Sequence, residues 1–163
     1  MMSSLKSKII SETGMARNRI VHAMILLSIL LVASCKKEES GISEVPEITF
    51  VSITPASQKE FENPFIITVS YKDGDGDLGE NNPDVKNLFV KDNRIGITYE
   101  YRLQQLAPDN AAVPIQGTFT IDLPLLGITN GNNSQLATFE VYVTDRNNNR
   151  SNTIATSAVT IIK

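Results

Sequence analysis

Five carboxylates lie within one short stretch of the sequence, YKDGDGDLGENNPD at residues 71–84. Calcium in proteins takes roughly six to eight oxygen ligands from carboxylates, carbonyl groups and water. Acids at every second position can point into one tight loop, since the intervening glycines permit positive φ angles. The spacing of Asp73, Asp75 and Asp77 therefore predicts a calcium site, where the ion would offset the repulsion among the three side chains.

The order of the acids partly matches an EF-hand calcium loop. Leu78 occupies the sixth position, where the EF-hand needs Gly, and no helical pattern follows. We therefore expect a calcium loop between two strands, with a polar turn that binds nothing as the alternative, because Asp and Gly are also common turn residues. The candidate ligands, which include one from a later loop, are Asp73, Asp75, Asp77, Gly79, Asn81, Asp84 and Asp145.

The elements that would position these ligands are strands. From residue 46 onward, apolar and polar residues alternate with a period of two, and Asn-Gly, Asn-Pro and Asn-rich turns separate the runs. No stretch after residue 40 has the apolar stripe of an amphipathic helix. The alternation predicts strands at 48–53, 65–72, 87–91, 97–103, 117–123, 136–144 and 153–162.

This pattern predicts an all-β domain over residues 46–163, an immunoglobulin-like antiparallel β-sandwich of about seven strands. A jelly roll is the alternative, but it needs about eight longer strands. In the immunoglobulin-like arrangement, the acidic stretch and the later stretch DRNNNRSN, residues 145–152, emerge at the same end. Asp145 is thereby brought to the predicted calcium site, while Arg146 and Arg150 provide an alternative counter-charge for the acids.

Residues 1–34 have the three parts of a secretory signal peptide: a basic start, an apolar run from Ile20 to Val32 and small residues after it. The run has 13 residues, whereas a bilayer-spanning helix needs roughly 20. The following VASC sequence resembles a bacterial lipobox. That resemblance implies cleavage before Cys35 and a lipid anchor on this residue, by which the protein would partner the membrane.

Residues 35–45, CKKEESGISEV, are charged and contain few large apolar groups, so we expect a flexible tether. The start of this segment also resembles the short Lys-then-acid signal that directs Bacteroidetes lipoproteins to the outer face of the outer membrane. A generic charged tether is the other interpretation.

Charge and composition exclude several classes of function. Residues 35–163 carry 17 Asp and Glu against 11 Lys and Arg, a net charge of −6, which argues against nucleic acid as a partner. The sole histidine, His22, lies in the predicted signal peptide, and the sole cysteine is the predicted lipid site. Catalysis that depends on histidine or a free thiol is therefore not expected, and we predict that the protein is not an enzyme.

Two segments together resemble a family of uncharacterised Bacteroidetes lipoproteins with an immunoglobulin- or cadherin-like domain. These segments are YKDGDGDLG and VTDRNNNRSNTI, and the resemblance extends over roughly residues 46–163. It implies an outer-membrane lipoprotein that faces the cell exterior. Two functional classes stay open: a surface binding or adhesion module for a glycan or protein, and a structural accessory lipoprotein whose acidic loop is only solvated or paired with arginine.

Overall fold

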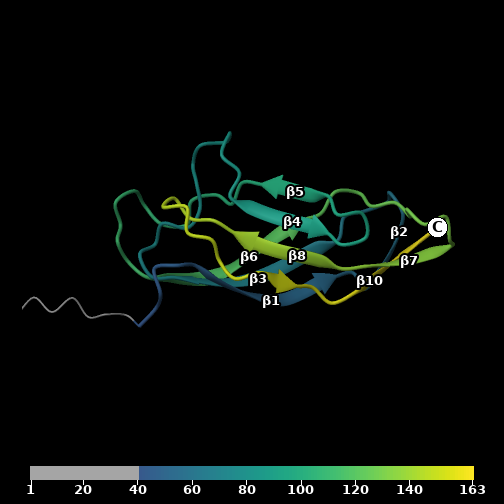
Figure 1. The fold of residues 1–163 in the computed structure, drawn as a ribbon, viewed down its shortest axis with the longest axis horizontal. Helices are drawn as coiled ribbons and strands as arrows, with labels where there is room; N and C mark the ends of the chain where they lie inside the picture. The colour runs from purple at the N-terminus through teal and green to yellow at the C-terminus, as the bar shows by residue number, and fades with distance from the viewer. Residues whose placement is uncertain (1–40) are drawn as a thin grey trace, which may run out of the picture. The chain divides into compact units, whose positions relative to one another are not determined.

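The computed structural model describes residues 41–163, which contain ten β-strand segments and no helix (Figure 1). The predicted signal peptide at 1–34, Cys35 and the first part of the predicted tether lie outside the described residues. Within residues 41–163, no helix is long and apolar enough to cross a membrane.

The first sheet contains the strand that leads into the acidic stretch. Its order is β1 (Glu47–Thr54), β3 (Ile66–Asp73) and β6 (Ile115–Asp122), and both pairings are antiparallel. The alternation along β3 buries Ile67, Val69 and Asp73, while Ile66 and Lys72 are exposed. An aspartate thus occupies a core-facing position at the end of a central strand.

The second sheet has the order β5 (Thr98–Tyr101), β4 (Leu88–Asp92), β8 (Phe139–Val143) and β9 (Ile154–Ala155), all antiparallel. Phe139, Val141 and Val143 are fully buried, as the alternation predicts. Tyr142 points to the other face, where its ring stacks on Phe89 with centroids 4.7 Å apart. The predicted strand 97–103 is shorter in the structure, since only Thr98–Tyr101 pair with β4.

A third, smaller sheet has the order β2 (Ser57–Lys59), β10 (Val159–Ile162) and β7 (Ser134–Ala137). β10 pairs with β7 antiparallel and with β2 parallel. β2 was not predicted, because Ser-Gln-Lys has no apolar alternation. The predicted strands 136–144 and 153–162 are each divided into two segments, and at the division the Phe139 amide donates to the Thr156 hydroxyl instead of a ladder carbonyl.

The sheets share one hydrophobic core, to which the first and second sheets contribute buried side chains such as Ile67, Val69, Val90 and Val141. This arrangement is consistent with a β-sandwich. Tyr99 and Tyr101 are half-buried against that core. At one end of the domain, the loops after β3, β5 and β8 gather beside the first described residues (Figure 1).

Candidate metal centre

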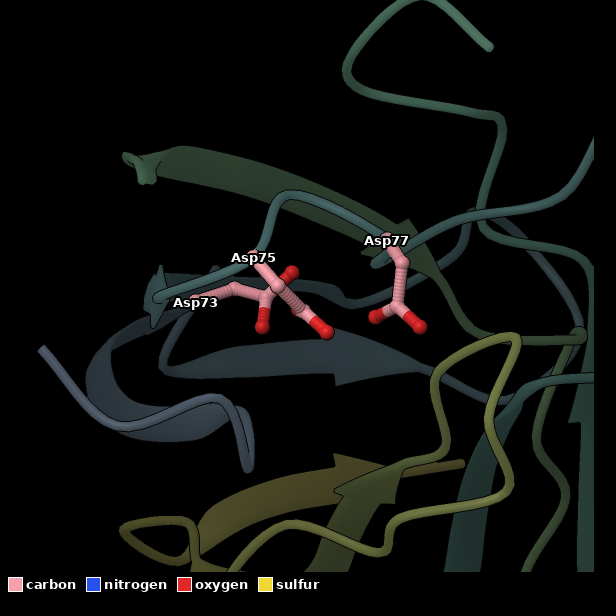
Figure 2. A group of neighbouring side chains, drawn as sticks. All are labelled: Asp73, Asp75 and Asp77. Carbon is pink, nitrogen blue, oxygen red and sulfur yellow. The ribbon is translucent and has the colours of Figure 1, made fainter. Parts of the chain in front are cut away.

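The three alternating aspartates form one compact group. β3 ends at Asp73, and the chain continues into the acidic loop, residues 73–87, which leads to β4. One carboxylate oxygen from each of Asp73, Asp75 and Asp77 lies within 4.8 Å of the others. Figure 2 shows that the three carboxyl groups point to the same side of the loop. Among the acidic, His and Cys residues of 41–163, this is the only group of three or more with such spacing.

Four oxygen atoms of this aspartate triad are buried without a hydrogen-bond partner among residues 41–163. They are Oδ1 of Asp73, Oδ1 of Asp75 and both oxygens of Asp77. Asp73 itself is 0% exposed, and only its Oδ2 is satisfied, by the Leu78 amide at 2.9 Å. A buried polar atom without a partner costs free energy, and a buried charge costs more. Several acceptor oxygens therefore lie where a positively charged ligand would supply the interaction that they lack.

The electrostatics of the triad agree with this geometry. Burial, together with the smaller effects of the charges of Asp75 and Asp145, raises the pKa of Asp73 to about 6, against the lowering effect of the Leu78 amide. Burial also raises the pKa of Asp77 to about 6, with Asp145 as the next contributor and a smaller opposing effect from Arg146. The ionised carboxylates of Asp73 and Asp77 thus lie in surroundings that disfavour their charge.

The glycines of the acidic loop allow other chain segments to approach it. Gly76 and Gly79 have φ angles of +74° and +93°, as the sequence reasoning anticipated for a tight loop. Their packing was not anticipated. A Cβ at Gly79 would lie 2.8 Å from the Gln105 Cα, and one at Gly76 would overlap the Val113 carbonyl oxygen. A side chain at either position would push backbone away, so both glycines hold the loop beside the β5–β6 connection.

The loop between β8 and β9, residues 144–153, contacts the acidic loop. The Arg146 amide donates to the Asp77 carbonyl at 3.4 Å, and Asn147 Nδ2 donates to Asp75 Oδ2 at 3.5 Å. Asp145 is 5% exposed, but its two carboxylate oxygens accept from Asn149, through the amide at 2.7 Å and Nδ2 at 2.9 Å. Asp145 therefore acts on the triad through its charge, while its oxygens close its own turn.

Neither candidate arginine pairs with the triad. The Arg146 guanidinium donates to the Gly79 carbonyl at 3.1 Å and the Gly76 carbonyl at 3.5 Å, so it binds the backbone of the acidic loop. Arg150 lies over the Tyr142 ring, with its Cζ 3.7 Å from the centroid. The ion pairs found within residues 41–163 are elsewhere: Lys59–Glu62, Lys91–Glu140 and the buried pair Arg94–Asp92 at 2.6 Å.

The remaining predicted ligands do not join the triad. The Gly79 carbonyl accepts from Arg146, as described. Asn81 donates to the Gln105 side chain. Asp84 is exposed, and its amide donates to Asn82 Oδ1 at 3.1 Å. The EF-hand numbering therefore does not describe this loop beyond its first three acids.

Sequence reasoning missed Asn87, which organises the end of the acidic loop. Asn87 is 4% exposed, its Oδ1 accepts from the Leu103 amide at 2.6 Å, and its Nδ2 donates to the Leu103 carbonyl at 3.3 Å. Its own carbonyl accepts from the Thr144 amide at 2.9 Å. One side chain thus joins the acidic loop to the segment after β5 and, through its backbone, to the end of β8. Before a short apolar run, an asparagine looks like an ordinary turn residue, so the sequence carried no signal for this role.

Comparisons with protein-family models, with curated proteins and with solved structures find no match for this chain. One local detail supports the predicted turn chemistry: Asn148 has a φ of +64°, which glycine and asparagine adopt most readily.

Proposed function

We propose that this protein is a lipid-anchored cell-envelope protein whose immunoglobulin-like domain binds one calcium ion at its loop end. The main observation in support of a bound ion is that four buried carboxylate oxygens of Asp73, Asp75 and Asp77 have no hydrogen-bond partner. The immunoglobulin-like assignment is supported by the sheet orders β1-β3-β6 and β5-β4-β8-β9 and by the parallel pairing of an early short strand, β2, with the last strand.

Calcium fits the donor set better than other metals. The triad offers only oxygen atoms, and residues 41–163 contain neither His nor Cys, the ligands that zinc and similar metals prefer. Magnesium requires near-ideal octahedral geometry and usually retains several waters. Isothermal titration of calcium into metal-stripped full chain is expected to give one ion per chain. A flat titration would remove the calcium proposal.

The burial of these oxygens favours an ion that stabilises the loops over one that bridges to an external ligand. Each unpartnered oxygen is shielded from solvent by the protein itself. An ion bound there would join the end of β3 to the β8–β9 loop, through Asp73, Asp77 and the charge of Asp145. The binding free energy would then add to the stability of the folded domain.

The surface that would bind a partner is the exposed face of the second sheet. There Phe89, Tyr142 and the Arg150 guanidinium form a continuous stack. Aromatic faces and edges of this kind are common in binding sites, which favours the binding or adhesion module over the accessory lipoprotein. On a glycan array, we expect binding that Tyr142→Ala abolishes and Tyr99→Phe, a change on the core side, retains. A blank array, together with no co-purifying protein, would favour the accessory lipoprotein.

The membrane anchor is a separate part of the proposal. It is supported by the apolar run, the small residues and the single cysteine at position 35. Each buried CH₂ of an acyl chain contributes about 0.8 kcal/mol to membrane binding, so several chains on one residue would hold the protein firmly. We expect Cys35→Ser to prevent incorporation of labelled fatty acid and to move the protein from the membrane to the soluble fraction. Unchanged membrane partition of this variant would contradict the anchor.

A further inference from the structure

The first described residues lie directly against the metal centre. Gly74, between Asp73 and Asp75, donates its amide to the carbonyl oxygen of Ser43 at 2.8 Å. Gly74 therefore not only separates two of the acids but also contacts the segment before the first strand. The site is built from the acidic loop, the β8–β9 loop and a segment that precedes the first strand, residues 42–45.

Gly74 is required for this contact because of the space it leaves. A Cβ at position 74 would lie 2.6 Å from the Ser43 carbonyl oxygen and 2.7 Å from the Ser43 carbonyl carbon, and it would also overlap the Ile42 carbonyl oxygen. Gly74 is not among the glycines with positive φ, so backbone conformation does not explain it. The close approach of Ile42 and Ser43 explains why position 74 is a glycine.

Just after this segment, the chain is held by the β8–β9 loop. Pro46 is buried, and Ile48 forms two hydrogen bonds with the Asn152 side chain: its amide donates to Oδ1 at 2.9 Å, and its carbonyl accepts from Nδ2 at 2.8 Å. Asn152 belongs to the β8–β9 loop, which also contacts Asp75 and Asp77 through Asn147 and Arg146. Residues 42–48 thus contact both the acidic loop and the β8–β9 loop.

We propose that residues 42–45 form one wall of the cation site, so that ion binding and docking of this segment are coupled. The inference rests on the proposed calcium site. An ion between Asp73 and Asp75 fixes Gly74, whose amide holds Ser43, and the docked segment in turn fixes the two aspartates. Because such coupling is reciprocal, the segment must raise calcium affinity by the same factor by which calcium stabilises the docked segment.

The coupling has a consequence for the anchored protein. With the segment docked, the connection between Cys35 and the described domain ends near residue 41. Release of residues 41–45 would lengthen that connection by at most about 17 Å, since an extended chain spans roughly 3.5 Å per residue. Calcium would therefore set how closely the domain is held to the lipid anchor.

Amide hydrogen exchange of the full chain, in calcium chloride and in EDTA, tests the coupling. We expect calcium to slow exchange of two amides about tenfold: that of Gly74, which donates to the Ser43 carbonyl, and that of Ile48, which donates to Asn152 Oδ1. The Leu123 amide, which donates to the Phe65 carbonyl in the first sheet, should follow only the change in global stability. If calcium raises the melting temperature but leaves exchange of the Gly74 and Ile48 amides unchanged, the coupling is wrong and the calcium site stands. If calcium changes neither quantity, the calcium site itself fails.

Gly74→Ala provides the reciprocal test, since it keeps all three aspartates and removes the room for Ser43. We expect its calcium affinity to fall about tenfold and the Ile48 amide, which donates to Asn152 Oδ1, to exchange rapidly even with calcium present. The matched control is Gly131→Ala, because a Cβ at Gly131 meets no atom of residues 41–163 within 4 Å. Wild-type calcium affinity in folded Gly74→Ala would overturn the proposal, and if this variant does not fold, the wild-type exchange measurement decides.

Discussion

Calcium is expected to raise the melting temperature of the full chain by about 10 °C, and the double substitution Asp73→Asn, Asp75→Asn is expected to abolish this rise. Calcium at about 100 times its Kd stabilises the folded state by about 2.7 kcal/mol, and for a domain of this size each 1 kcal/mol shifts the melting temperature by roughly 2–8 °C. The measurement is thermal unfolding followed by circular dichroism, with calcium chloride and with EDTA.

The wild type and the double variant should exchange their order of melting temperature between EDTA and calcium. In EDTA, the double variant should melt above the wild type, because it removes buried charges that repel one another. In calcium, the wild type should melt higher. Asp84→Asn with Glu100→Gln is the matched control, since it makes the same charge change at two exposed acids. Identical melting of the wild type in calcium and EDTA would favour a turn without an ion.

The stability of the metal-free protein and the stabilisation by calcium should depend on pH in opposite directions. The folded-state pKa values of Asp73 and Asp77, about 6, lie above the ordinary value of 3.8. In the metal-free protein, the stability that these groups contribute is therefore fully present below pH 3.8 and is lost as the pH rises through about 6. Calcium needs the ionised carboxylates, so its stabilising effect should appear over the same pH range. A calcium effect of equal size at pH 4 and pH 7 would contradict this assignment.

Gly79→Ala is expected to lower the free energy of unfolding by about 3 kcal/mol or more, while Gly131→Ala lowers it by about 1 kcal/mol. Both glycines have positive φ, +93° and +77°, so both variants incur backbone strain. Only at Gly79 would the added Cβ also collide with backbone, 2.9 Å from the Gln104 carbonyl carbon and 2.8 Å from the Gln105 Cα. The difference between the variants in urea unfolding measures the packing of the acidic loop against the β5–β6 connection. Equal losses would show that the loop has no need of this contact.

Much of the strand pattern could be predicted because one face of each strand is buried. The alternation in residues 136–144 placed Phe139, Val141 and Val143 inside, and these three side chains are fully buried. Alternation fails where contacts do not depend on apolar side chains. The short strand β2 pairs through backbone alone, and Ile97 is exposed although it continues an alternating pattern.

The candidate site was predictable in its acids and unpredictable in its shape. Spacing alone selected Asp73, Asp75 and Asp77, since alternating residues in an extended or tightly turning chain share a side. Spacing also selected Asn81 and Asp84, which the structure places in other contacts, because the EF-hand comparison assumed that the chain keeps wrapping one centre. Instead, the chain turns at Gly79, where Arg146 binds the carbonyl oxygen. No local pattern could reveal a contact between residues so distant in sequence.

A crystal structure of the protein grown with calcium, with anomalous scattering to identify the ion, tests most directly whether the aspartate triad binds calcium. We predict one calcium peak between Asp73, Asp75 and Asp77, with carboxylate oxygens at about 2.3–2.6 Å. A guanidinium group or ordered water in that position, with no anomalous signal, would contradict it.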